Sequence, residues 1–397
     1  MSRHPQQSTG EGFARRLKAF YAALFMTLGV QLPFLPAWLA AKGLDPQGIG
    51  IVLALPMIVR VFAIPIATRA ADRHDALRAV IVIAASAAVA GYGAFALAEG
   101  LIAIMVTCAL ASVAYTPVML LADAYALRGL TRWGLAYGPV RLWGSVAFIV
   151  ASFGAGSLLD VIAPLDLIWL IVAAMVLAAV AACALAPLGP GGGARGAPAK
   201  TRAATQLLRD PAFLAVAAAA SLIQASHAIY YGFSTIAWQS AGFDGMAIGA
   251  LWALGVLAEI ALFAISARLP FPPTTLLLIG AAGAFIRWGA MALAPPIAVL
   301  PLLQCLHALS FGATHLGALG FVARAAPVGL GATAQGYLAV ALGLAMAAAM
   351  GLSGLLYGRY GNLAYAAMAL AACAGGLCAL VGRRRTDNGR RITDEER

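Results

Sequence analysis

Long apolar runs, separated by short polar or basic stretches, make up most of this chain. Each run is about 20 residues or longer, which is the length that a helix needs to cross the hydrocarbon core of a bilayer. Lipid offers no partner to an unpaired backbone group, so we expect helices, and the alternating pattern of barrel strands is absent from the sequence. The pattern predicts an all-α membrane protein with twelve transmembrane helices. We place them at 17–41, 48–69, 77–98, 100–127, 138–160, 164–187, 211–240, 246–268, 274–294, 297–323, 330–357 and 361–381.

Two of these runs repeat each other at long range. Residues 38–69 and 238–268 align after one deleted residue, and Arg60 in the first copy corresponds to Glu259 in the second. The aligned identities are Gly43/Gly242, Asp45/Asp244, Ile49/Ile248, Gly50/Gly249 and Arg69/Arg268. A repeat of this length indicates a duplicated membrane domain, and duplicated membrane domains are typical of transporters.

A stretch rich in glycine, proline and basic residues lies between the two copies and is typical of a flexible connector. We therefore expect a cytoplasmic linker at 189–209. It would join two pseudo-symmetric six-helix bundles, an N-terminal one at 1–188 and a C-terminal one at 210–397 that ends in a basic cytoplasmic tail.

The chain is 62% hydrophobic and only 10% charged, whereas about a quarter of the residues in soluble domains are charged. A net charge of +11 invites a nucleic-acid partner, but nearly all of the 26 lysines and arginines fall in loops and ends on one side of the predicted helices. Such asymmetry follows the positive-inside rule. We therefore expect both termini in the cytoplasm and no nucleic-acid partner, since no soluble domain is present to bind one.

Catalytic and metal-binding motifs are missing from the sequence. It contains no HExxH, no GxSxG and no P-loop, which argues against a membrane-embedded enzyme and against ATP-driven pumping. The five cysteines lie in predicted helices without the paired CxxC spacing of metal sites. We expect no enzymatic activity, no cofactor and no bound metal.

Five charged residues, histidines aside, lie in the interior of the predicted helices and away from their ends, where a charge is costly and usually functional. They are Arg60, Asp123, Arg141, Glu259 and Arg287. Three arginines against two carboxylates leave one surplus positive charge, which an anionic substrate would neutralise on binding. The planar fork of arginine suits a carboxylate. The alternative is a static network of salt bridges that holds the helices together.

Polar side chains also recur at helical spacing in two predicted helices. His307, Ser310 and Thr314 share one face of the tenth helix, and the seventh carries Gln224, His227 and Tyr231 at the same spacing. The repeat places Gln31 of the first helix at the position of Tyr231. Such stripes line a cavity or make hydrogen bonds between packed helices. Histidine adds a proton site near neutral pH.

Several stretches resemble the 3-phenylpropionate/proton symporter group of the major facilitator superfamily. They are YGPVRLWGSVAF (137–148), HAIYYGFSTIAWQSAGF (227–243), IGALWALGVLAEI (248–260), IRWGAM (286–291) and LHALSFGATHLGAL (306–319). The resemblance implies the major facilitator fold, in which two six-helix halves close around a central cavity. It also implies proton-coupled import across the inner membrane of a bacterium.

A more distant resemblance is to lactose permease. Asp123 and Arg141 look like its substrate-binding acid–arginine pair, and Glu259, Arg287 and His307 look like its proton-linked set in kind and order. The permease carries a carboxylate one turn after the histidine and a lysine one turn before it, where this chain has Ser310 and Gln304. Proton coupling would then depend on Glu259, His307 or Asp123, and the departure argues against a sugar substrate.

Taken together, these patterns predict a secondary active transporter. We expect proton-coupled symport of a small organic, aromatic carboxylate-like solute by alternating access, in a functional monomer whose partners are substrate, protons and membrane lipid. The alternatives are a uniporter or exporter of the same fold for a sugar or nucleoside, and a non-transporting membrane sensor. The predicted substrate-binding and coupling residues are Arg141, Glu259, His307, Arg60, Asp123, Arg287, His227, Tyr231 and Gln31.

Overall fold

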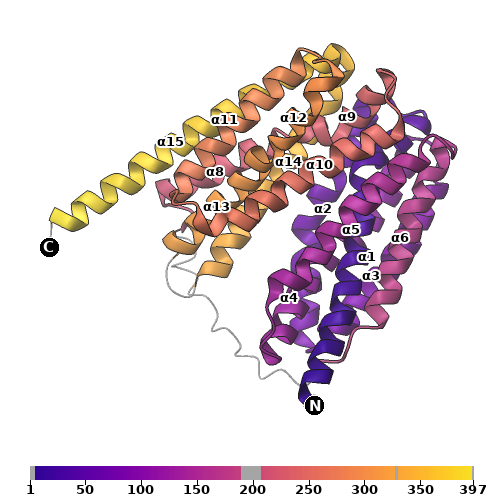
Figure 1. The fold of residues 1–397 in the computed structure, drawn as a ribbon, viewed down its shortest axis with the longest axis horizontal. Coiled ribbons are helices and arrows are strands. Elements are labelled where there is room, and N and C mark those ends of the chain that lie inside the picture. The colour runs from indigo at the N-terminus through magenta and orange to yellow at the C-terminus, as the bar shows by residue number, and fades with distance from the viewer. Residues whose placement is uncertain (1–4, 189–206, 327–329, 396–397) are drawn as a thin grey trace. The chain divides into compact units, whose positions relative to one another are not determined.

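The computed structural model describes residues 5–188, 207–326 and 330–395, and these ranges contain helices and turns but no strand (Figure 1). Eleven described segments are long and apolar enough to cross a membrane. The last of them, Thr333–Arg385, contains two helices, so each of the twelve predicted spans corresponds to a helix or to a broken helix. Most of the predicted linker at 189–209 lies outside the described residues, which resume at 207.

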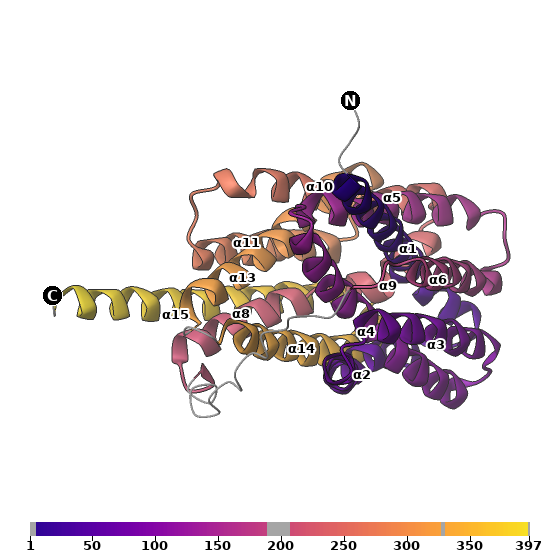
Figure 2. The same cartoon turned by 90° about the horizontal axis from the view of Figure 1, so that it is seen from below.

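The first of two compact units comprises Met1–Gly192 and Phe233–Ala253. Within it α1 packs against α5 and α6, and α4 packs against α2 and α3 (Figures 1 and 2). Large side chains such as Phe20, Tyr21 and Tyr125 fill its core. The helices of the first half of the chain are α1 (Pro5–Ala41), α2 (Pro46–Arg73), α3 (Leu77–Leu97), α4 (Leu101–Arg132), α5 (Tyr137–Leu158), η1 (Pro164–Asp166) and α6 (Leu167–Cys183).

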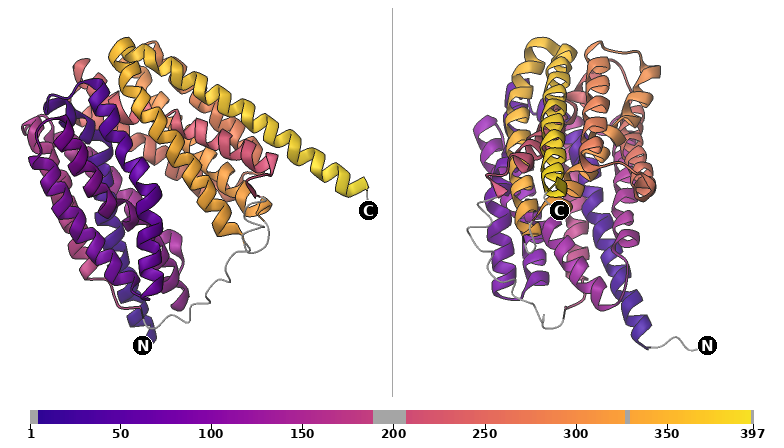
Figure 3. Two further views of the ribbon diagram at one scale, coloured as in Figure 1. Left: turned by 180° about the vertical axis from the view of Figure 1, so that it is seen from behind. Right: turned by 90° about the vertical axis from the view of Figure 1, so that its left-hand side faces the viewer.

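The second unit comprises Gly193–Gly232 and Leu254–Arg397. In it α15 packs against α8 and α11, and α14 packs against α8. The end of α15 projects beyond the helices of this unit (Figure 3), so the predicted basic tail continues the last helix. The helices of the second half of the chain are α8 (Pro211–Ala225), α9 (Ala228–Ser240), α10 (Gly245–Ile265), η2 (Ser266–Arg268), α11 (Pro273–Ala292), η3 (Ile297–Val299), α12 (Leu300–Cys305), the π-helical η4 (Ala308–Ala313), α13 (Thr314–Ala325), α14 (Gly331–Tyr360), η5 (Gly361–Ala364) and α15 (Tyr365–Glu395).

The segment Phe233–Ala253 packs with the first unit because α10 approaches α5 closely. A Cβ atom added to Gly156 would collide with the backbone carbonyl of Gly245. The backbone N–H of Gly245 also donates to the Asp160 carboxylate, at 3.0 and 3.1 Å to its two oxygens. Glycine is required at such contacts because any side chain would force the two backbones apart.

The internal repeat is reproduced in the local geometry. Gly43 and Gly242 both adopt a positive φ, 83° and 85°, at the turn before each repeated helix. Asp45 and Asp244 then each accept a hydrogen bond, 2.8 and 2.7 Å, from the backbone N–H three residues later, as helix-capping residues do. The aligned positions thus build the same turn and helix start twice.

Two predicted helices are interrupted where their polar stripes lie. The predicted span at 211–240 breaks between α8 and α9 at Ser226 and His227, and the one at 297–323 contains the π-helical turn Ala308–Ala313. At the first break the imidazole of His227 lies 3.2 and 3.1 Å from the carbonyl oxygens of Ile223 and Gln224. Side-chain insertion of this kind interrupts a helix without proline, and π-turns concentrate at functional sites.

Candidate functional site

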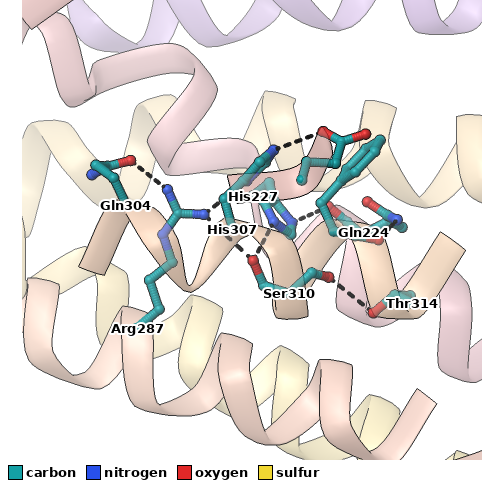
Figure 4. Close-up of polar contacts among 9 residues, drawn as sticks. Gln224, His227, Arg287, Gln304, His307, Ser310 and Thr314 are labelled. Atoms are coloured by element: carbon teal, nitrogen blue, oxygen red, sulfur yellow. Dashed lines mark hydrogen bonds and ion pairs between the residues drawn. The ribbon is translucent and has the colours of Figure 1, made fainter. Parts of the chain in front are cut away.

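A fully buried arginine lies at the centre of a polar cluster in the second unit. Arg287 of α11 has no exposed surface, and its guanidinium lies 4.4 Å from the ring of Tyr230 and 4.5 Å from that of Trp288. Its Nη2 donates to Oε1 of Gln304 at 2.7 Å and its Nη1 donates to Nδ1 of His307 at 3.0 Å (Figure 4). Neutral acceptors and aromatic faces thus solvate this cation.

Arg287 carries its charge without a carboxylate of the described ranges within ion-pair distance. Each hydrogen bond to a charged group contributes about 1.5–3 kcal/mol, and a desolvated cation–π contact about 2 kcal/mol. These contributions offset the desolvation of the guanidinium, which costs several kcal/mol in a protein interior. Within the described part of the chain, Nε of Arg287 and Nε2 of Gln304 have no hydrogen-bond partner. The cluster therefore keeps unused donors.

His307 connects Arg287 to Glu259 of α10. A guanidinium only donates, so Nδ1 of His307 is the acceptor and the single proton of the neutral ring is on Nε2. That nitrogen lies 3.8 Å from Oε2 of Glu259, and the two side chains are 9% and 18% exposed. Glu259 and His307 therefore form a partly accessible acid–base pair beside the buried arginine.

His227 lies on the other side of the cluster. Its Nδ1 faces two backbone carbonyls, which only accept, so Nδ1 carries the proton and Nε2 receives the hydroxyl of Ser310 at 3.1 Å. The same hydroxyl oxygen accepts a long hydrogen bond, 3.4 Å, from Nη1 of Arg287. Ser310 therefore links the second histidine to the arginine, and it occupies the position that a carboxylate holds in lactose permease.

The structure brings together the predicted residues of the second half of the chain: Arg287, Glu259, His307 and His227. Tyr231 joins them by stacking on His227, with ring centroids 5.5 Å apart.

Four further side chains, Tyr230, Trp288, Gln304 and Ser310, belong to this cluster but were not among the predicted site residues. The sequence carried a signal for two of them. Gln304 and Ser310 lie three residues before and after His307, on the polar face of the predicted helix.

In the first unit the predicted acid and arginine do not pair directly. Asp123 accepts hydrogen bonds on one oxygen from the hydroxyls of Tyr21, at 2.6 Å, and Tyr137, at 2.8 Å. The Arg141 guanidinium lies 3.8 Å from the ring of Phe25 and 5.7 Å from that of Tyr21. No carboxylate of the described residues lies within ion-pair distance of Arg141. This half-buried arginine therefore packs against aromatic rings, and its N–H donors are not paired with a carboxylate of the described residues.

Gln31 and Arg60 also belong to the first unit but do not contact Asp123 or Arg141 through a hydrogen bond or ion pair of the described residues. Nε2 of Gln31 donates to the hydroxyl of Tyr92 at 2.7 Å, and its Oε1 has no partner among the described residues. Arg60 of α2 is half-buried. No hydrogen bond or ion pair of the described residues joins either of them to Asp123 or Arg141. The described residues also contain no group of three or more side chains suited to a metal ion.

Comparison with known proteins places this geometry in a family. A family model described as the MFS_1 like family matches residues 14–367. The Escherichia coli (strain K12) protein named "Probable 3-phenylpropionic acid transporter" is 34% identical over 368 residues, which cover 90% of this chain and 95% of that protein. The maltose permease of Geobacillus stearothermophilus is 30% identical over 329 residues, covering 82% of this chain and 83% of the permease.

Solved structures agree on the fold. The nucleoside transporter NupG superposes with a TM-score of 0.79 at 17% identity, covering 94% of this chain and 99% of that chain. A bacterial homologue of the human lysosomal transporter Spinster gives a TM-score of 0.72 at 14% identity, covering 97% and 99%. The chain therefore belongs to the MFS_1 like family of the major facilitator superfamily, as a multi-pass inner-membrane transporter and not an enzyme.

Proposed function

We propose that this protein imports a small aromatic carboxylate together with protons, by alternating access, and that 3-phenylpropionate is the first solute to test. The observation that carries the proposal is the cluster of the buried Arg287 with His307 and the partly buried Glu259. It combines an arginine that has no carboxylate partner among the described residues with an acid–base pair that can take up a proton. The name of the Escherichia coli relative suggests the solute.

Arg141 supports the proposal from the first unit. Its guanidinium stacks on Phe25 at 3.8 Å. A Cβ atom on Gly144 would come within 2.7 Å of the same ring, so the glycine leaves room for the stack. An arginine held by an aromatic face and without a paired carboxylate in the described ranges offers its planar fork to an anion. We assign to Arg141 a direct contact with the substrate.

Flux measurement in proteoliposomes tests the function. Purified protein is reconstituted, and uptake of labelled 3-phenylpropionate is followed with and without an inwardly directed proton gradient. We expect accumulation above the equilibrium level only when the gradient is present. Equal uptake under both conditions would leave a uniporter. Saturable binding without any flux would identify a sensor, and outward movement that drives proton entry would identify an exporter.

A uniporter for a sugar is the second candidate. The 30% identity to maltose permease favours it, as does the engagement of Arg287 with Gln304 and His307, which leaves fewer donors for an anion. A competition assay with aromatic acids, nucleosides and maltose separates the two. Displacement of bound 3-phenylpropionate by other aromatic acids, and not by maltose, supports the carboxylate carrier.

We further propose that the transporter works as a monomer in contact with lipid and that both of its termini lie in the cytoplasm. The support is the distribution of basic residues, such as Arg73 and Arg78 around the α2–α3 turn and Arg383 to Arg385 of α15. A reporter fused to the C-terminus that is active only in the cytoplasm tests the orientation. Inactivity of that fusion would reverse the assignment.

A further inference from the structure

We propose that a proton on Nδ1 of His307 and the hydrogen bond from Arg287 to that atom exclude each other, so that protonation of His307 frees the Arg287 guanidinium to bind the carboxylate of the solute. This inference rests on the proposed function and adds which atom takes the proton and what the proton changes. One proton would enter the cluster with each carboxylate.

The proposal rests on the hydrogen bond from Arg287 that already occupies Nδ1 of His307. In the cluster Nδ1 of His307 accepts from Nη1 of Arg287 at 3.0 Å (Figure 4). The imidazole proton is therefore on Nε2, which lies 3.8 Å from Oε2 of Glu259. A second proton on this ring can bind only to Nδ1, the remaining unprotonated nitrogen. Two donors cannot share one lone pair, so the arginine has to leave that atom when the proton arrives. Repulsion between the imidazolium and the guanidinium acts in the same direction.

Glu259 gives a protonated His307 a counter-ion, which His227 lacks among the described residues. An imidazolium at His307 has the carboxylate of Glu259 within 3.8 Å. His227 is fully buried, its Nε2 is occupied by the Ser310 hydroxyl, and no carboxylate of the described ranges lies within ion-pair distance of it. The titratable or charged groups packed around this centre are Arg287, Glu259, His227, Tyr230 and Tyr231, with Tyr365 beyond Trp288 and His315 beyond Phe311.

The step balances in atoms and in charge. A proton from water forms an N–H bond at Nδ1, and the hydrogen bond from Nη1 of Arg287 is broken, while no other covalent bond changes. The charge of Arg287, His307 and Glu259 rises from zero to plus one, and a bound carboxylate returns it to zero. The released Nη1 adds to Nε, which has no partner in the described part of the chain, while Gln304 still holds Nη2.

Because of this exclusion, proton binding and carboxylate binding each affect the other. If a proton favours binding of the carboxylate, the carboxylate favours binding of the proton by the same factor, and such couplings are typically 5- to 150-fold. The protein therefore links the two ligands through one hydrogen bond that forms in their absence. Ser310 and Gln304 act as positioning residues, since they hold Arg287 in reach of His307.

Titration calorimetry tests the inference. 3-Phenylpropionate is titrated into the purified full-length protein near neutral pH, in buffers of different ionisation enthalpy, which counts the protons taken up with each ligand. We expect about one proton for the wild type and none for His307→Asn, whose Oδ1 takes the place of Nδ1 and keeps Arg287 engaged. The Kd of this variant should rise about tenfold. His74→Asn, at the exposed end of α2, is the matched control and should keep the wild-type count.

The possible results separate the exclusion at Nδ1 of His307 from the proposed carboxylate transport. Binding without proton uptake by the wild type, or uptake that persists in His307→Asn, overturns the exclusion at Nδ1 and leaves carboxylate transport standing. No binding of 3-phenylpropionate by the wild type overturns the proposed function as well. Nitrogen NMR of histidine-labelled wild type needs no variant. It should show Nδ1 of His307 unprotonated in the free protein and protonated in the complex, and a protonated Nδ1 in the free protein would contradict the proposal.

Discussion

Replacing Arg141 by lysine separates the shape of this side chain from its charge. The lysine keeps the positive charge but loses the planar fork and most of the stacking on Phe25, which lies 3.8 Å from the guanidinium. One charge-assisted hydrogen bond contributes about 1.5–3 kcal/mol and a cation–π contact about 0.5–2 kcal/mol. Part of each survives in lysine, so we expect a net loss of about 2–3 kcal/mol, which corresponds to a roughly 30- to 150-fold rise in the Kd for 3-phenylpropionate.

The assay is equilibrium binding by purified protein, followed by uptake in proteoliposomes. Arg128→Lys is the matched control, because Arg128 makes an ion pair of 2.7 Å with Asp75 at the protein surface, where lysine can replace it. We expect less than a twofold change for the control, together with normal membrane insertion of both variants. A Kd for Arg141→Lys within threefold of the wild type would refute a direct contact between Arg141 and the substrate.

Three further perturbations follow from the contacts. Glu259→Gln removes the counter-ion of a protonated His307, so we expect solute exchange between loaded liposomes to persist while gradient-driven accumulation is lost; accumulation at the wild-type level contradicts this. Gly156→Ala places a Cβ against the facing backbone of α10, whereas Gly154→Ala meets nothing within 4 Å; the yield of folded protein should fall only for the former, and equal yields count against the close helix contact. Tyr21→Phe removes one of two hydroxyl donors to Asp123 and should lower the unfolding free energy by about 2 kcal/mol; an unchanged thermal midpoint in detergent excludes that contribution.

The helices could be predicted because lipid imposes a simple rule on the sequence. Apolar runs of sufficient length, together with the repeat of 38–69 in 238–268, indicated a duplicated helical membrane protein. The family match and the described helices confirm this fold. The aligned glycines Gly43 and Gly242 even share their backbone conformation. The division into two six-helix halves at 189–209 stays a prediction.

The interruptions of the helices could not be predicted from local sequence. Neither the break at His227 nor the π-turn at Ala308–Ala313 contains a proline. The first coincides with a side chain that hydrogen-bonds to the carbonyls of its own helix and to Ser310 of another. Such contacts exist only in the folded protein, so a residue pattern that marks an amphipathic helix gives no sign of them.

Residue types indicated which side chains would gather, but not how they would pair. The charges of Arg287, His307 and Glu259 pointed to one polar centre, and the structure brings them together. The resemblance of Asp123 and Arg141 to a substrate-binding acid–arginine pair did not indicate which groups hold each side chain. In the structure the hydroxyls of Tyr21 of α1 and Tyr137 of α5 donate to the Asp123 carboxylate.

The ratio of protons to carboxylates moved across the membrane tests the coupling between His307 and Arg287 most directly. In proteoliposomes holding 3-phenylpropionate on both sides, the pH gradient that stops net flux is measured at several imposed solute gradients and membrane potentials. One proton per carboxylate is electroneutral, so we predict that equal and opposite gradients cancel and that the membrane potential has no effect. A null point that shifts with the potential, or flux that ignores the pH gradient, would contradict this coupling.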